Sequence, residues 1–170
     1  MATFGATCPK PLIVNPGGPV RHYEVASGQT FVAGDFVYLD ASSQLVIAAA
    51  PSAAVGDVRL FIAQGNAADA LNSDLATKLC GVIECRPGTE AMLQVYHATP
   101  ASAVIAQTDT DTPLTLPLVN IGGVWGLDIA NDGSANSRCI VLEKAPNEPW
   151  SEPAGTFKVA FRTTKAFSYE

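Results

Sequence analysis

The chain has 170 residues, of which 48% are hydrophobic and only 15% are charged, and this composition excludes an intrinsically disordered protein. Its formal charge of −6 argues against general binding to nucleic acid, which requires a basic face. No apolar run reaches the ~18 to 20 residues of a membrane span, and the N-terminus lacks the features of a signal peptide, so we expect a cytoplasmic protein without nucleic acid or membrane partners.

Charge is distributed unevenly along the chain. Residues 1–21 contain two basic residues and no acidic one, and residues 158–170 contain three basic residues and one acidic one. The intervening residues carry five basic and fifteen acidic side chains, so the net charge is −10 in the body and +4 at the ends. This split indicates that the ends contact an acidic partner surface, while the acidic body keeps free copies apart.

Residues 1–22 are expected to form an extended arm, and residues 23–170 a single domain. Four prolines and three glycines precede residue 20, and proline neither continues a helix nor donates a hydrogen bond within a central strand. The apolar residues of the arm favour packing against its own subunit or a neighbouring one. The alternative is a frayed terminus.

The first strong strand pattern lies between residues 27 and 50. Gly34 and Asp35 predict a turn, because glycine takes positive φ at no cost and aspartate can hydrogen-bond its own backbone. Residues 36–39, Phe-Val-Tyr-Leu, predict a strand with apolar neighbours on both faces. Residues 40–44 have the length of a hairpin connection, and residues 45–47 return as the next strand.

The next two patterns predict a strand and a helix. Residues 58–63 alternate, with Val58, Leu60 and Ile62 on one face and Arg59 and Phe61 on the other, which is typical of a strand covered on one face. Residues 67–78 are the one helix that the sequence favours, because a capping pattern precedes two leucines spaced four residues apart. Its expected role is to cover an open end of a barrel.

Strand and turn signals continue to the C-terminus. The Arg-Pro-Gly-Thr sequence at residues 86–89 predicts a hairpin between strands at 79–85 and 91–97. Residues 99–115 are expected to be a surface loop. A turn at residues 131–134 predicts that strands at 124–129 and 138–142 pair. Together these patterns predict an all-β, jelly-roll-like barrel or sandwich of about eight to ten short strands.

The closing strand, residues 156–161, alternates clearly. Phe157, Val159 and Phe161 are expected to face the core. Lys158 and Arg162 then face outward, about 13 Å apart at ~3.3 Å per residue. Two roles stay open for them, namely contact with a neighbouring protein or protection of an exposed sheet edge.

The residues provide no recognised catalytic, cofactor or metal motif. Because we expect a cytoplasmic protein, we expect all four cysteines to be thiols. Four residues separate Cys80 from Cys85, a wider spacing than in a zinc knuckle, so buried apolar roles are favoured over zinc binding. His22 and His97 lie at strand ends, where a structural role is favoured over that of a base. Two aspartate-containing clusters, at residues 109–111 and 128–132, are explained by turn propensity rather than calcium binding.

The order and spacing of nine short segments resemble the small capsid decoration, or cement, proteins of tailed bacteriophages. The resemblance covers residues 23–162. The segments are Gly28, Phe31-Val32, Gly34-Asp35, residues 36–39, 45–47, 81–83, 86–89, 125–128 and 156–161.

The resemblance implies a non-enzymatic structural protein of the virion. Such a protein is made in the cytoplasm of the host bacterium and binds the outer surface of the mature head. Its implied partners are the major capsid protein and other copies of itself, as a homotrimer or homodimer. The alternative is a carbohydrate-binding or head-fibre domain with Trp125, Trp150 and Tyr38 as platforms, although packing in a core or interface is favoured for the tryptophans. A small hydrolase of unfamiliar pattern is the third hypothesis.

The candidate contacts with the capsid or with other subunits combine apolar residues of the arm with basic residues of both ends. They are Phe4, Lys10, Leu12, Ile13, Val14, Arg21, Lys158, Arg162 and Lys165.

Overall fold

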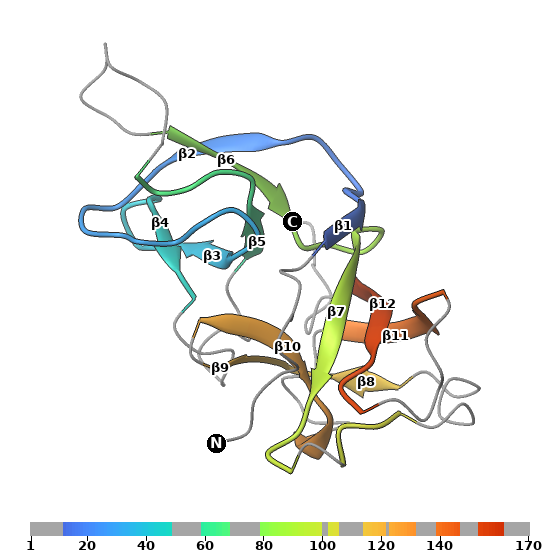
Figure 1. Ribbon diagram of the computed structural model, residues 1–170. Coiled ribbons are helices and arrows are strands. Elements are labelled where there is room, and N and C mark those ends of the chain that lie inside the picture. Colours follow the sequence, from blue (N-terminus) through green and yellow to red (C-terminus); the bar gives the residue numbers. More distant parts are fainter. Residues whose placement is uncertain are drawn as a thin grey trace.

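The computed structural model describes residues 12–48, 59–68, 79–99, 102–105, 114–121, 123–131, 139–146 and 153–161. Within these residues the chain forms twelve β-strands and one short 3₁₀ helix, Ile129–Asn131 (Figure 1). The predicted all-β class is therefore confirmed, with more strands than the expected eight to ten. The predicted helix at residues 67–78 lies outside the described residues, except for Ala67 and Ala68, which occupy a bend and a turn.

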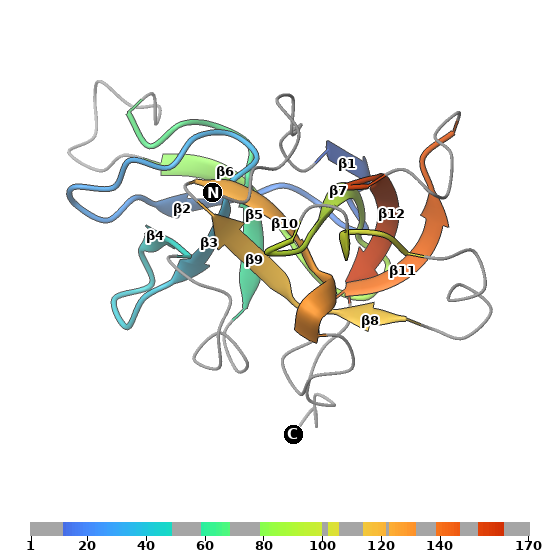
Figure 2. The same cartoon turned by 60° about the horizontal axis from the view of Figure 1, so that its bottom comes forward.

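The strands form two sheets in a nearly closed, barrel-like arrangement (Figure 2). The five-stranded sheet is antiparallel, in the order β2 (Arg21–Glu24), β6 (Leu79–Glu84), β5 (Leu60–Ala63), β3 (Phe36–Leu39) and β4 (Leu45–Ile47). The seven-stranded sheet has the order β8 (Thr115–Leu116), β11 (Cys139–Lys144), β12 (Thr156–Phe161), β7 (Glu90–Tyr96), β10 (Val124–Asp128) and β9 (Leu118–Ile121). Its remaining strand, β1 (Leu12–Asn15), pairs with β7 outside this order.

The predicted turn before β3 is confirmed. Gly34 has a φ of 89°, and the Asp35 amide donates to the Val32 carbonyl at 3.0 Å. The Asp35 carboxylate accepts a hydrogen bond from the Val32 amide at 2.8 Å, so both the side chain and the backbone of Asp35 stabilise the turn. The Gly34 amide donates to the Ala63 carbonyl at 2.8 Å, which fixes the turn against β5.

Two hydrophobic clusters lie on opposite faces of the five-stranded sheet. The main core lies between the two sheets and includes Phe36, Leu60 and Ile62. The outer core lies on the other face and includes Val37 and Phe61. The prediction that β3 has apolar neighbours on both faces is therefore confirmed.

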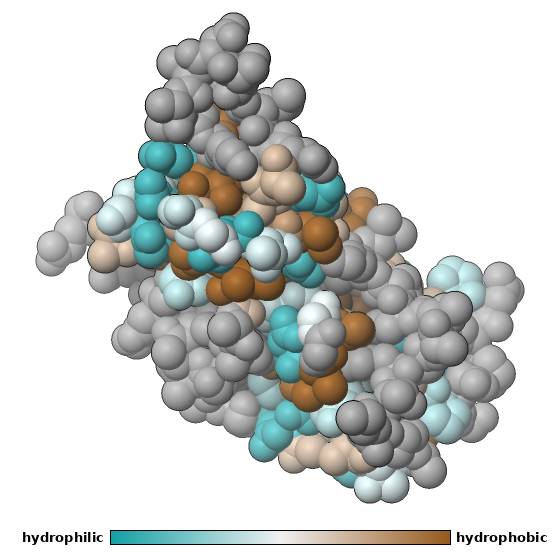
Figure 3. Space-filling model, turned by 60° about the vertical axis from the view of Figure 1, so that its left-hand side comes forward, coloured by the Kyte–Doolittle hydropathy of each residue, from teal (hydrophilic) through white to brown (hydrophobic). Residues whose placement is uncertain are grey.

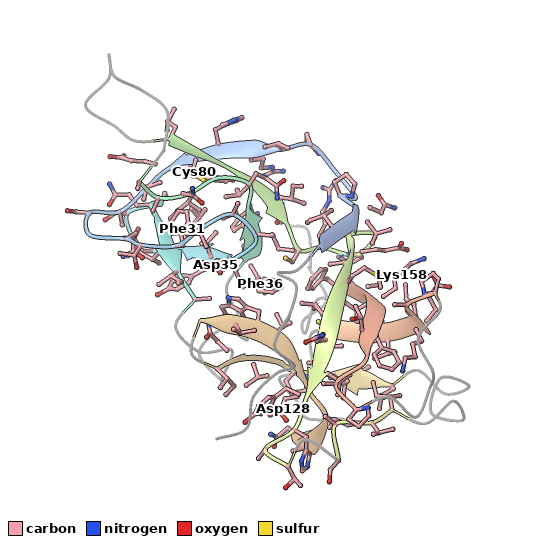
Figure 4. The ribbon with its side chains drawn as sticks, viewed as in Figure 1. Phe31, Asp35, Phe36, Cys80, Asp128 and Lys158 are labelled. Carbon is pink, nitrogen blue, oxygen red and sulfur yellow. The ribbon has the colours of Figure 1, made fainter. Side chains whose placement is uncertain are left out.

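The prediction that β5 is covered on one face only is wrong, because every residue of β5 is buried. The outer face is covered by segments of the same chain that precede β3 and follow β5. Phe31 and Ala67 are buried in this cover, and the Ala67 amide donates to the Phe31 carbonyl at 2.9 Å. Figure 4 shows Phe31 and Cys80 with the outer core and Phe36 on the side of the sheet that faces β10.

Phe36 lies at the centre of the main core. Its ring makes edge contacts with Trp125 of β10, at 4.9 Å between ring centroids, and with Phe161 of β12, at 6.0 Å. One side chain of the five-stranded sheet thus contacts two strands of the other sheet. Edge-to-face packing of this kind stabilises aromatic pairs beyond the effect of buried area.

The predicted hairpin at residues 86–89 is wrong, although its turn is correct. The Thr89 amide donates to the Arg86 carbonyl at 2.9 Å, and Gly88 has a φ of 93°. However, β6 and β7 belong to different sheets, so the turn carries the chain from one sheet to the other.

One further prediction about connections is wrong, and a second is wrong for the residues that the structure describes. The strands β10 and β11 do not pair, because β10 lies between β7 and β9 whereas β11 lies between β8 and β12. The expected surface loop at residues 99–115 is anchored at Ala103 and Ile105, which are buried in the main core. The Ala154 amide also donates to the Ala103 carbonyl at 2.8 Å.

Candidate protein-contact site at the arm

Five of the nine predicted contact residues lie in the described part of the chain. Leu12, Ile13 and Val14 are in β1, Arg21 begins β2, and Lys158 is in β12. The other four lie outside the described residues. They are Phe4, Lys10, Arg162 and Lys165.

Residues 12–15 of the predicted arm form the edge strand β1 on their own subunit. Leu12 lies opposite Met92 and Ile13 opposite Ala91 in an antiparallel pairing with β7. Ile13 is half-buried against the main core. The register shifts before Asn15, and Val14 at this irregularity is 50% exposed. The strand thus presents one apolar side chain inward and one outward.

The chain after β1 is fastened to the turn at residues 86–89 by side chains of that turn. The Thr89 hydroxyl lies 3.0 Å from the Pro16 carbonyl and 2.9 Å from the Glu84 carbonyl. Arg86 Nε donates to the Gly17 carbonyl at 3.1 Å, and Arg86 Nη2 contacts the same oxygen. We call this set of contacts the arm clip. It joins positions 69 to 73 residues apart in the sequence.

The arm clip leaves no room for a side chain at position 17, and a side chain at position 18 would require Arg86 to move. Gly17 has a φ of 61°, and a Cβ atom there would lie 2.7 Å from the Gly88 carbonyl carbon and from the Thr89 nitrogen. At Gly18 a Cβ atom would overlap the Arg86 guanidinium. Because contacts below 3.0 Å with backbone atoms cannot be relieved by a rotamer change, the arm lies flat on the turn only with glycine at position 17.

Basic side chains gather beside the arm clip. Arg21 Nη2 and Arg59 Nε each lie 3.8 Å from a different oxygen of the Glu84 carboxylate. A hydrogen bond with Tyr23, and then the charge of Glu84, raise the pKa of Arg21. Arg86, Arg21 and Glu84 also line a shallow hollow, together with prolines 16 and 19 and glycine 18 of the arm. We call Arg21, Arg59 and Arg86 the arginine patch.

Lys158 lies on the outward face of β12, as predicted, while Phe157, Val159 and Phe161 are buried. Its ammonium group is 2.8 Å from Glu143 Oε1 and 3.5 Å from Glu90 Oε2. The hydrogen bond with Glu143 is the main cause that raises the pKa of Lys158.

The alternative role of Lys158 as the guard of an exposed sheet edge is wrong. The strand β12 lies between β11 and β7, so both of its edges are paired. Lys158 has two carboxylate partners, the nearer at 2.8 Å, whereas Arg21 has one, at 3.8 Å. Met92 of β7 lies between Lys158 of β12 on one side and Leu12 of β1 on the other. Lys158 and β1 are therefore in the same sheet.

Two of the three aromatic residues that a carbohydrate-binding domain would need on its surface are buried or half-buried. Trp125 is 2% exposed and packs against Phe36, so it is a core residue, as favoured by the sequence. Tyr38 is half-buried against the main core. Trp150 lies outside the described residues.

His97 and Asp128 have structural explanations, whereas the aspartate cluster at residues 109–111 lies outside the described residues. His97 Nδ1 accepts the Thr99 amide at 2.9 Å, and the Asp128 carboxylate accepts hydrogen bonds from Ala130 and Asn131 within its own turn. Within the described ranges, no group of three His, Cys, Asp or Glu residues could hold a metal ion. In the described part of the chain, the cysteines at positions 80, 85 and 139 are thiols.

Sequence and structure comparisons add no relative. No family model, curated protein or solved structure matches the chain. No helix in the described part of the chain is long and apolar enough to cross a membrane.

Proposed function

We propose that the protein is a structural component of a bacteriophage head that binds the outer surface of the mature capsid. In this role it holds neighbouring major capsid subunits together and does not act as an enzyme. The proposal combines the resemblance over residues 23–162 with the arrangement of the arm on the body. It also includes self-association as a dimer or trimer, and synthesis in the cytoplasm of a bacterial host.

The observation that carries the proposal is that residues 12–21 of the arm lie on the body and expose side chains for contact. The arm clip fixes residues 16 and 17, while Val14 and Val20 on either side are 50% and 47% exposed. The Arg21 side chain, next in sequence, is 42% exposed. The buried centres of protein interfaces are more apolar than their rims, and arginine is enriched in interfaces.

A preorganised contact edge suits a protein that binds in many copies to a repeating surface. Because the arm is held on the body, little conformational entropy is lost when it meets a partner. Several modest contacts per copy, multiplied through an oligomer, give high avidity without a deep pocket. On the side shown in Figure 3, coloured apolar and hydrophilic residues are interspersed in small groups, which suits contacts of this modest kind.

The experiment uses heads of the phage that carries this gene, produced from a genome in which the gene is deleted. Purified protein is incubated with mature heads and with unexpanded precursors, and bound protein is separated by sedimentation through a gradient. We expect saturable binding to mature heads and a higher temperature of head disruption. Protein that stays at the top of the gradient at every concentration would exclude the proposed function.

A further inference from the structure

Three arginines lie near one carboxylate at the start of the five-stranded sheet's first strand, where two of them pair with it. Arg21 comes from β2, Arg59 immediately precedes β5, and Arg86 follows β6. Glu84 is the carboxylate that contacts the first two, and it lines the same hollow as Arg86. These four side chains have a local charge of +2, on a chain whose formal charge is −6.

The other described cations are differently placed. Lys144 is 8% exposed and lies over the Phe157 ring, at 5.3 Å from the ring centroid. Lys158 is paired with two carboxylates. Among the described residues, excess positive charge that is open to solvent is therefore concentrated at the arginine patch, where Arg21 and Arg59 side chains are 42% and 54% exposed.

The arginine patch has hydrogen-bond donors left for a further anion. Each guanidinium carries five N–H donors, and a planar pair of them matches a carboxylate. Glu84 offers one oxygen to Arg21 and the other to Arg59, both at 3.8 Å, so neither arginine holds it in the close two-pronged geometry. Arg86 uses Nε and Nη2 on the Gly17 carbonyl, which fixes the position of its side chain.

We propose that Arg21, Arg59 and Arg86 form a binding site for a carboxylate-rich loop of a partner protein. In this site the partner's carboxylates bind Arg21 and Arg59, and Arg86 supplies a fixed positive charge at the edge. The partner loop lies over the hollow rather than in it, because the hollow does not admit a water-sized molecule. The identity of the partner as a capsid subunit rests on the proposed function, whereas the chemistry of the site does not.

A protein loop fits the site better than a nucleic acid. A loop with two or three carboxylates needs only the local charge of +2, whereas a long polyanion would extend over a chain with sixteen acidic and ten basic residues. Repulsion by that acidic surface is long-ranged at low salt, and it would oppose the polyanion most strongly under the conditions that favour nucleic acid binding.

Replacing Glu84 tests the proposal, because the proposal predicts whether binding of an external carboxylate becomes stronger or weaker. Because Glu84 occupies the two arginines that the partner would bind, it acts as an internal competitor. Replacing it with glutamine should strengthen binding of an external carboxylate, whereas a purely structural ion-pair network would gain nothing. Glu24→Gln makes the same change in net charge on β2, opposite Leu79 of β6, and serves as the matched control.

The probe is an acetylated and amidated peptide of four glutamates, with four glutamines as its neutral counterpart. Binding is followed through the arginine Nε–H signals in ¹⁵N NMR spectra of the whole protein at low salt. Arg21→Gln with Arg59→Gln should weaken glutamate-peptide binding about tenfold, and Glu84→Gln should strengthen it about threefold, as expected for modest surface charge pairs. Glu24→Gln should change it less than Glu84→Gln, and ~1 M salt should abolish it.

Several results would overturn the proposal. One is equal binding of the glutamate and glutamine peptides, and another is weaker binding in Glu84→Gln. Tighter binding of a twelve-base oligonucleotide than of the glutamate peptide would assign the patch to nucleic acid. A change in oligomeric state in the double arginine variant, with peptide binding unchanged, would assign it to contacts between copies.

Head binding separates this inference from the proposed function. If the wild type and the folded double arginine variant occupy heads equally, the arginine patch is not the contact and the proposed function stands. If the wild type binds the glutamate peptide through the patch but binds no head, the proposed function fails and the carboxylate site stands. A thermal melt of each variant confirms that these exposed substitutions leave the fold intact.

Discussion

Substituting Gly17 with alanine tests the arm clip, and Gly28 provides a matched control. Both glycines have positive φ, 61° and 77° respectively. A Cβ atom at Gly17 would lie 2.7 Å from two backbone atoms of the 86–89 turn, whereas a Cβ atom at Gly28 would have no neighbour within 4 Å. Alanine therefore has the same backbone strain at both sites, and only position 17 adds a steric clash.

The two contributions set the expected magnitudes. Left-handed backbone conformation costs a residue with a Cβ atom about 1–2 kcal/mol, so Gly28→Ala should lower the free energy of unfolding by that amount. A clash in a tightly packed region adds about 1–3 kcal/mol, giving about 2–5 kcal/mol for Gly17→Ala. This cost is limited by the free energy that holds the arm on the body, because the arm can detach while the rest of the domain stays folded.

Hydrogen–deuterium exchange read by mass spectrometry separates local detachment from global destabilisation. In Gly17→Ala, residues 12–18 should exchange at least about thirtyfold faster, since ~2 kcal/mol of local opening corresponds to that factor. Residues 36–39 should keep their protection. In Gly28→Ala the arm should exchange as in the wild type. Equal exchange of residues 12–18 in Gly17→Ala and the wild type would refute the close approach of arm and turn.

Three further predictions concern the body. Phe36→Ala should lower the free energy of unfolding by about 3–5 kcal/mol in urea titrations, because this ring joins the two sheets, and a loss below ~1 kcal/mol would contradict that position. Cys80 and Cys139 are buried, and burial raises the pKa of the Cys80 thiol, so a thiol reagent should label them slowly in native protein and rapidly in denaturant. Fewer than four thiols in unreduced, denatured protein would indicate a disulfide. The raised pKa of Lys158 implies that its pairing with Glu143 stabilises the fold below the ordinary lysine value of ~10.4, and that this contribution is lost as pH rises through the folded value. In Lys158→Met the free energy of unfolding should therefore depend less on pH above pH ~10 than in the wild type. The same pH dependence in both proteins would show that the ion pair does not stabilise the fold.

Features determined by neighbouring residues could be predicted from the sequence. The uninterrupted Phe-Val-Tyr-Leu of β3 indicated burial on both faces, and the alternation of β12 indicated one inward row. The Gly34-Asp35 turn was predicted from the conformational freedom of glycine and the short side chain of aspartate. Each of these features depends on residues within about six positions of one another.

Features that depend on distant residues could not be predicted. A proline-glycine turn at residues 86–89 reverses the chain, but it does not specify which sheet each flanking strand joins. The outer face of β5 is buried because Phe31, about thirty residues earlier, folds over it. The arm clip joins Arg86 to the Gly17 carbonyl. Because every residue has a backbone carbonyl, the sequence does not indicate which one Arg86 binds. The hairpin of β9 and β10 does have a local signal in the sequence. Two adjacent glycines, at positions 122 and 123, separate two largely apolar segments, a pattern that is typical of a hairpin.

Electron cryomicroscopy of heads saturated with the protein tests the central claim most directly. The heads are those that lack this gene product, so any added density comes from the purified protein. We expect density outside the capsid shell at repeated symmetry-related positions, with the arm, β1 and the arginine patch facing the shell. The absence of added density on mature heads, or attachment through the opposite end of the body with the arm exposed to solvent, would contradict this account.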